Sequence, residues 1–106
     1  MGQITSLVSP DGHSFEIYDA HPKGTQTGVV VVIQEIFGVN AHIQEVCNGF
    51  AADGYVAIAP ALFDRAERDV DLGYEEEDRQ KGMGLRAQTD WGDNVQDAIA
   101  APVSYT

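Results

Sequence analysis

The pattern of hydrophobic and polar positions begins with two short apolar segments, Ile4–Val8 and Ser14–Ala20, on either side of the sequence SPDG at residues 9–12. Proline presets φ in a turn and glycine accepts positive φ, so Pro-Asp-Gly between apolar segments is a turn signal. The first two segments are therefore predicted to form an antiparallel β-hairpin.

The next apolar segment, Val29–Gln34, is a continuous run of mostly β-branched residues without polar alternation. Such runs are typical of parallel strands that helices cover on both faces. The run ends on an acid, Glu35. Ligands of open α/β sheets bind at the carboxyl ends of strands, which makes Glu35 a candidate functional residue. The alternative interpretation is that Glu35 has no functional role, and that its carboxylate caps the next helix or faces solvent.

A helix is predicted after this strand, with Asn40 as its N-cap and Gly54 as its stop signal. Its apolar residues fall on one stripe of a 3.6-residue period: Ile43, Val46, Cys47 and Phe50. Another short strand, Tyr55–Ala59, follows and ends at Pro60. The segment Val29–Ala59 is thus predicted to be a β-α-β unit with parallel strands and a right-handed crossover.

The remaining sequence is predicted to be a charged loop, Leu62–Asp78, and one long helix, Arg79–Ala101, which Pro102 closes. The loop is interpreted as a solvated acidic face; calcium binding is the sharper alternative, but no EF-hand pattern is present. Helical spacing continues through the apolar residues Trp91, Val95, Ala98 and Ile99, and Trp91 is expected in the core. Glycines in this helix weaken it by roughly 1 kcal/mol each relative to alanine.

Composition narrows the class of protein. The formal net charge of −11 argues against nucleic acid or anionic membrane partners, because phosphate binding requires a basic surface. Apolar residues make up 43% of the chain, which fits one small globular domain over residues 1–106. No apolar run approaches the roughly 20 residues of a membrane span, and no signal peptide is visible, so a cytoplasmic protein is expected. The single cysteine, Cys47, is interpreted as a core residue.

Four sequence segments, in order, resemble the N-terminal half of the dienelactone hydrolases, also called carboxymethylenebutenolidases: SPDGHSFEIY, GVVVVIQEIFGVNAHIQEV, FAADGYVAIAPALFDR and LGYEEEDRQKG. The most specific motif is QEIFGVN. The resemblance implies the first half of an α/β-hydrolase sheet: a β-hairpin, then β-α-β, then a helix. It also implies hydrolysis of small lactones or esters, without a cofactor.

The resemblance assigns roles to three places. Glu35 corresponds to a strand-end glutamate that modulates the nucleophilic thiol, and Ile36 to a residue whose backbone N–H belongs to the oxyanion hole. Either Arg79 or Lys81 stands where the family places a cation for the substrate carboxylate, and the alignment of DRQK favours Lys81. A lysine binds as a point charge rather than as a bidentate fork.

The chain departs from the family pattern because the cysteine elbow G-x-C-x-G, and the Asp and His that complete the triad, are not in the sequence. The similar EVCNG has Glu45 where the elbow needs glycine, and its cysteine falls in a helical stripe. The domain is therefore interpreted as truncated before the elbow, and the chain alone is expected to be inactive. The alternative function is a non-catalytic remnant that dimerises or binds a complementary chain through the open edge of Val29–Gln34.

Overall fold

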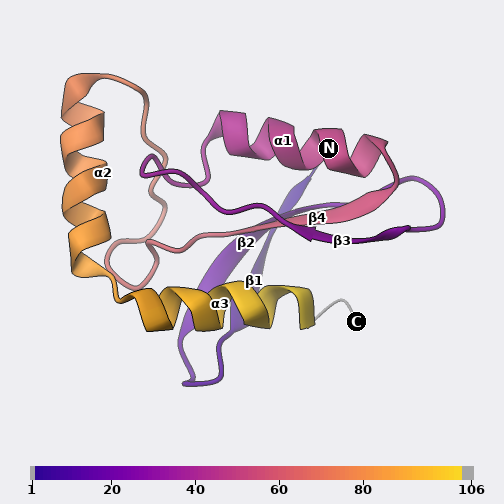
Figure 1. Cartoon of the computed structure of the whole chain (residues 1–106), viewed down its shortest axis with the longest axis horizontal. Coiled ribbons are helices and arrows are strands. Elements are labelled where there is room, and N and C mark those ends of the chain that lie inside the picture. Colours follow the sequence, from indigo (N-terminus) through magenta and orange to yellow (C-terminus); the bar gives the residue numbers. More distant parts are fainter. Residues whose placement is uncertain (1, 104–106) are drawn as a thin grey trace.

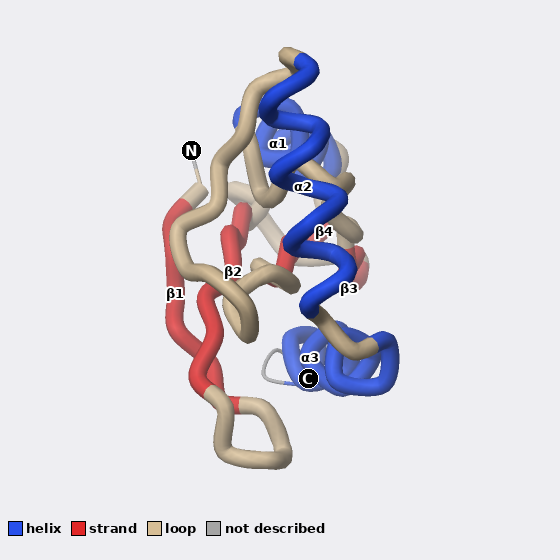
Figure 2. Tube along the Cα trace, turned by 90° about the vertical axis from the view of Figure 1, so that its left-hand side faces the viewer, coloured by secondary structure: helices blue, strands red, loops and turns tan. Residues whose placement is uncertain are grey.

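The computed structural model describes residues 2–103, and the fold consists of one four-stranded sheet with three helices (Figure 1). The elements in chain order are β1 (Gln3–Val8), β2 (Ser14–Ala20), β3 (Gly28–Val31), α1 (Ala41–Ala52), β4 (Tyr55–Pro60), α2 (Glu76–Gln88) and α3 (Trp91–Val103). The strand order is β1-β2-β4-β3. Figure 2 shows this order from left to right, with α2 standing in front of the sheet.

The predicted hairpin and β-α-β unit are both confirmed. β1 and β2 pair antiparallel, and Gly12 in the turn between them has φ +87°. β3 and β4 pair parallel, and β4 also pairs antiparallel with β2. The described chain is therefore an α/β fold, the class predicted for the N-terminal half of an α/β-hydrolase sheet.

Two apolar clusters lie on opposite faces of the sheet, because side chains alternate along its strands. On one face, Tyr18 and Ala57 pack with Cys47 of α1. On the other, Ile17 and Ile58 pack near α3. Figure 1 shows α1 above the sheet and α3 below it. The helices on both faces make β4 a fully buried strand after its first residue.

α1 begins and ends where the sequence predicts. The Asn40 side chain accepts a hydrogen bond from the Ile43 N–H at 3.2 Å, and Gly54 adopts φ +99° after the last turn. The predicted apolar stripe is correct for Ile43 and Cys47 but wrong for Phe50, whose side chain is 38% exposed and packs edge-on against Tyr55. Within residues 2–103, no helix is both long enough and apolar enough to cross a membrane.

The predicted strand Val29–Gln34 is too long at its carboxyl end, since β3 ends at Val31. The Val32 N–H still donates to the Ile58 carbonyl at 2.8 Å. In a parallel ladder, the next bond would run to the Val32 carbonyl from residue 60, which is a proline without an N–H. β3 also forms an edge of the described sheet, so its residues are half-buried rather than fully covered.

The single helix predicted over Arg79–Ala101 is wrong, because two helices occupy this region and the first begins inside the predicted loop. Thr89 has extended backbone angles and separates them. The Asp90 carboxylate accepts from the Asp93 N–H at 3.1 Å and so caps the first turn of α3. Pro102 does not close the helix from outside but lies within its last turn. Trp91, expected in the core, is 80% exposed as the first residue of α3.

Candidate active site

Glu35 and Ile36 lie in a tight turn a short segment beyond Val31, the last residue of β3, past the carboxyl end of the parallel pair. The Gly38 N–H donates to the Glu35 carbonyl at 3.2 Å, and Gly38 has φ +83°, which glycine adopts without strain. A side chain at Gly38 would also collide with the backbone carbonyl of Val70. The turn therefore needs glycine at position 38 for two reasons: its backbone has positive φ, and no side chain fits beside Val70.

The loop after β4 holds this turn in place. The Gln34 side-chain carbonyl accepts from the Leu62 N–H at 2.9 Å, which links β3 to β4 where their backbone ladder has ended. Further along, the Leu72 N–H donates to the Phe37 carbonyl at 2.9 Å. The Phe37 ring packs edge-on against Tyr74 with a centroid distance of 4.6 Å. The loop thus fixes residues on both sides of Glu35 and Ile36.

Helix α2 packs directly on Ile36 through a glycine. A Cβ at Gly82 would collide with the Ile36 backbone carbonyl, and Gly82 is buried in this contact. The absence of a side chain at one helical position therefore sets the distance between α2 and the turn.

A cavity of about 400 Å³ opens beside this turn. Glu35 is exposed, and Ile36 is half-buried. Among residues 2–103, the Ile36 N–H has no acceptor. The cavity walls come from the segment after β3, the loop after β4 and the junction of α2 and α3, and comprise Ile33, Gln34, Glu35, Ile36, Leu62, Phe63, Arg86, Thr89, Trp91 and Asn94.

The two cations that the sequence assigns to the substrate carboxylate are held by acids outside this lining. Lys81 Nζ lies 2.9 Å from Glu67 Oε2. Arg79 pairs with Glu76 at 2.9 Å, and the hydrogen bonds between them lower the pKa of Glu76 to about 2. Neither cation lines the cavity that contains Glu35 and Ile36. Their role as substrate contacts stays a prediction.

Sequence reasoning did not identify Arg86 and Trp91, which line the cavity together with Glu35. The sequence held no clear signal for Arg86, because Asp90, four residues later, could pair with it in the single helix that the periodicity predicts. Trp91 was assigned to the core by helical periodicity. Because the helix breaks at Thr89, Trp91 is the first residue of a new helix and is exposed rather than buried.

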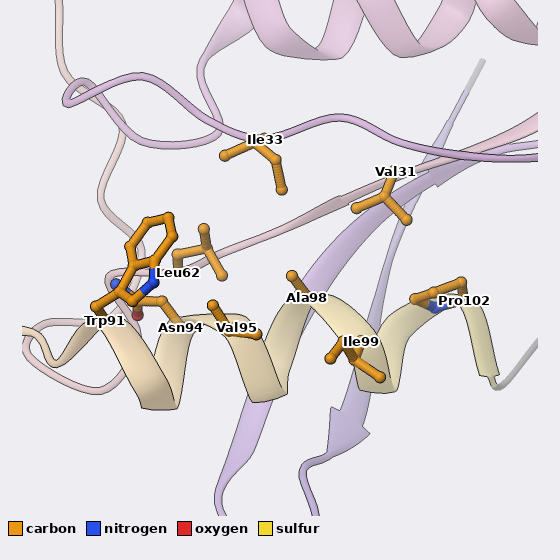
Figure 3. Close-up of a pocket in the computed structure, with 9 residues that line it drawn as sticks. All are labelled: Val31, Ile33, Leu62, Trp91, Asn94, Val95, Ala98, Ile99 and Pro102. Carbon is orange, nitrogen blue, oxygen red and sulfur yellow. The ribbon is translucent and has the colours of Figure 1, made fainter.

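A second, larger cavity of about 520 Å³ is an apolar groove between the end of β3 and α3 (Figure 3). Trp91 stands at one end of the groove and also borders the first cavity. Ile33 and Ile99, on its two sides, are 55% and 59% exposed. The groove is lined by Val31, Ile33, Leu62, Trp91, Asn94, Val95, Ala98, Ile99 and Pro102, none of which carries a charge.

Helix α3, which contributes to both cavities, is fixed by Arg65. The Arg65 guanidinium forms a bidentate pair with the buried Asp97 of α3, at 3.0 and 2.9 Å. It also contacts Asp11 in the hairpin turn at 2.8 Å, and this interaction holds the pKa of Asp11 well below its usual range. Arg65 therefore joins α3, the loop after β4 and the hairpin.

The interpretation of Cys47 as a core residue is confirmed. The side chain is fully buried in α1, and burial raises the pKa of the Cys47 thiol to about 11. The thiol therefore stays protonated at neutral pH, whereas a nucleophile needs the thiolate.

The fold is that of the N-terminal part of an α/β-hydrolase. The profile of the Dienelactone hydrolase family matches residues 15–106. A Synechocystis sp. protein provisionally named a carboxymethylenebutenolidase is 40% identical over 104 residues, 95% of this chain and 42% of that protein. The carboxymethylenebutenolidase of Pseudomonas putida is 34% identical over 97 residues, 91% of this chain and 41% of its own length.

A solved structure agrees with the sequence matches. A Klebsiella pneumoniae protein provisionally called a dienelactone hydrolase superimposes with a TM-score of 0.70 at 28% identity, covering 95% of this chain and 42% of that one. The chain belongs to the dienelactone hydrolase family. It spans about two fifths of the length of these relatives.

Proposed function

We propose that this chain supplies the N-terminal wall of a hydrolase active site that cleaves small carboxylic esters or lactones. The observation that carries the proposal is the placement of Glu35 and Ile36 in one cavity, at the carboxyl ends of the parallel strands β3 and β4. This is the edge of an open α/β sheet where ligands bind. Membership of the dienelactone hydrolase family supports the same reaction class.

The residues present suit two tasks in ester or lactone hydrolysis. When a nucleophile attacks the carbonyl carbon, the carbonyl oxygen gains negative charge, and a backbone N–H placed beside it stabilises that charge. Ile36 would supply this donor. Glu35 would act on the attacking thiol, as the family resemblance implies. The thiol itself would come from the Cys-His-Asp triad of the intact enzyme, because Cys47 is buried and protonated.

Joining this chain to the missing part of a relative should produce an esterase. We would fuse residues 1–106 to the segment of the Synechocystis relative that follows its matched region, and measure hydrolysis of p-nitrophenyl acetate and a dienelactone. The fusion should hydrolyse at least one substrate and lose activity on thiol alkylation, whereas this chain alone should be inactive. Glu35→Gln should lower kcat/KM of the fusion about tenfold or more, since positioned acid–base groups contribute about 10²–10⁴-fold.

The matched control is Glu45→Gln, which removes an exposed carboxylate on α1, outside the residues that line the cavity. It should leave kcat/KM unchanged. A fusion that melts cooperatively but hydrolyses neither substrate would refute the proposal.

A second candidate function is binding through the open edge of the sheet. β3 is an edge strand, and the apolar groove lies beside it (Figure 3). An edge strand offers unpaired backbone donors and acceptors, and an adjoining apolar surface favours association. We propose that the chain, in the absence of catalysis, pairs there with a second copy or with a complementary chain.

Sedimentation velocity at micromolar concentration tests this second function. The chain should sediment as a dimer or, mixed with the C-terminal segment of the Synechocystis relative, as a heterodimer. Ile33→Lys should abolish association, because it places a charge in the groove. Ile4→Lys is the matched control on the opposite edge strand, where Ile4 is equally exposed. A monomer whose Val29–Gln34 amides are fully protected from hydrogen exchange would contradict edge pairing.

A further inference from the structure

The outer edge of β3 lacks the charged residues and prolines that usually protect an exposed edge strand. Among residues 2–103, β3 pairs with β4 on one side and has no strand on the other. Edge strands commonly avoid pairing with other chains by carrying a lysine, another charged residue or a proline. Residues 28–34 contain no charged residue and no proline, and all but Gly28 and Gln34 are valine or isoleucine. This edge is therefore open to another strand.

The hydrogen bonds to β4 define which residues of this edge face outward. The Val32 N–H donates to the Ile58 carbonyl at 2.8 Å, and Val31 is the residue opposite Ile58 in the parallel register. The N–H and C=O groups of successive residues point to opposite sides of a strand, so those of Val29, Val31 and Ile33 point away from β4. A new strand at this edge would therefore bond to alternate residues centred on Val31.

These outward groups are symmetric about Val31, so the segment can pair with an antiparallel copy of itself. Val31 would face Val31 of the second copy, and Val29 would face Ile33. Each of these is a hydrogen-bonded pair, in which the two residues exchange both N–H···O=C bonds. The same register places Glu35 opposite Thr27, so that no carboxylates face each other across the strands. A two-fold axis perpendicular to the sheet produces this arrangement and leaves both α3 helices on the same face of the combined sheet.

Helix α3 supplies the apolar surface that strand pairing alone lacks. β3 has only four residues, but Ile99 and Pro102 of α3 lie below Val31 and line the same groove (Figure 3). A two-fold axis through Val31 therefore brings Ile99 near Ile99 of the second copy. Ile33 and Ile99 are more than half exposed and Val95 is 37% exposed, and the second copy would cover them. A strand edge and three such side chains suit an interface at the low end of specific association, about 600 Å² per partner, so a weak dimer is expected.

We propose that the occupant of this open edge is a second copy of the chain, paired antiparallel through β3 about a two-fold axis at Val31. The proposal rests on the second candidate function above and deepens it by naming the partner and the register. The self-complementary register and the absence of charge from the groove favour this occupant over a basic partner. Each copy has a formal net charge of −11, so two copies repel each other. Raising NaCl from about 20 to 300 mM screens that repulsion and should strengthen the dimer, whereas it would weaken the binding of a basic partner.

Disulfide crosslinking of cysteine variants measures the register directly. Val31→Cys should crosslink to its own copy on mild oxidation, because hydrogen-bonded residues of an antiparallel pair lie about 5.5 Å apart at Cα, within the range of a disulfide. Val29→Cys and Ile33→Cys should each fail to crosslink alone, since the same residue of the second copy is four positions away, about 14 Å. An equimolar mixture of these two variants should crosslink. The buried, protonated Cys47 takes no part.

A charge on α3 tests the packing of the helices. Ile99→Lys should abolish the dimer in sedimentation velocity at micromolar concentration, because it places two like charges near the axis. Met83→Lys is the matched control, since Met83 is 46% exposed on α2 and does not line the groove. It should leave the dimer intact. Far-UV circular dichroism establishes that each variant is folded.

Three results would each overturn the proposal: a wild-type chain that stays monomeric at about 100 μM, well above the micromolar range of a weak dimer, a dimer that weakens as salt rises, or Val29→Cys crosslinking alone as fast as Val31→Cys. Failure of the second candidate function gives a different result. If the chain is monomeric but binds the C-terminal segment of the Synechocystis relative, and Ile33→Lys abolishes that binding, the open edge binds a complementary chain and only the second-copy proposal fails. If neither association occurs, both proposals fail.

Discussion

Replacing Arg65 by methionine should lower the free energy of unfolding by about 3–5 kcal/mol, because it leaves the buried carboxylate of Asp97 without a partner. Asp97 is 1% exposed and Arg65 15% exposed, so solvent cannot replace the lost bidentate contact. The exposed Asp11 loses its partner in the same variant but can be rehydrated. Urea denaturation of the wild type and the variant measures the difference.

A double variant separates pairing from packing at this position. Arg65→Met combined with Asp97→Leu removes both charges, and should recover most of the stability lost in the single variant. Lys81→Met is the exposed control, because its pair with Glu67 is about half solvent-accessible on both sides. It should change stability by less than about 1 kcal/mol. Equal losses for Arg65→Met and Lys81→Met would show that burial of the pair is unimportant.

Replacing Gly82 by alanine should destabilise the protein by up to about 2 kcal/mol, although the same change stabilises most helices. Alanine is better than glycine in a helix by about 1 kcal/mol. At Gly82, however, the new Cβ meets the backbone carbonyl of Ile36, which cannot rotate away. Overpacking of this kind costs about 1–3 kcal/mol and forces α2 away from the turn.

Gly84→Ala is the matched control on the same helix, since nothing lies within contact distance of a Cβ there. It should stabilise the protein by up to about 1 kcal/mol. Thermal or urea unfolding of the two variants should therefore give shifts of opposite sign. Shifts of the same sign would mean that α2 does not rest on Ile36 as described.

Much of the fold was predictable because its signals are local. The turn around Gly12, the cap at Asn40 and the stop at Gly54 each depend on the backbone preference of one or two residues, and each is confirmed. The periodicity of Ile43 and Cys47 likewise identified the buried face of α1. Where one residue type specifies one backbone geometry, the sequence is sufficient.

Most of the incorrect predictions concern features that depend on neighbouring elements of the fold, and one concerns a local signal. β3 ends early because of a proline on the adjacent strand, which only the sheet register reveals. The break between α2 and α3 is a local signal that helical periodicity obscured, since Asp90 has the side chain of an N-cap. For the site, Glu35 and Ile36 were found from a motif. Arg86 and Trp91 enter the cavity through the packing of two helices against that motif, which periodicity alone does not describe.

The loop after β4 has a consequence for how the length of this chain can vary. Surface loops usually tolerate insertions and deletions. This loop is attached twice to the turn that carries Glu35 and Ile36, through Leu62 to Gln34 and through Leu72 to Phe37. The segment between these two attachments therefore acts as a spacer whose length is fixed by the turn at its two ends. Changes in its length would reshape the cavity without altering any residue that lines it.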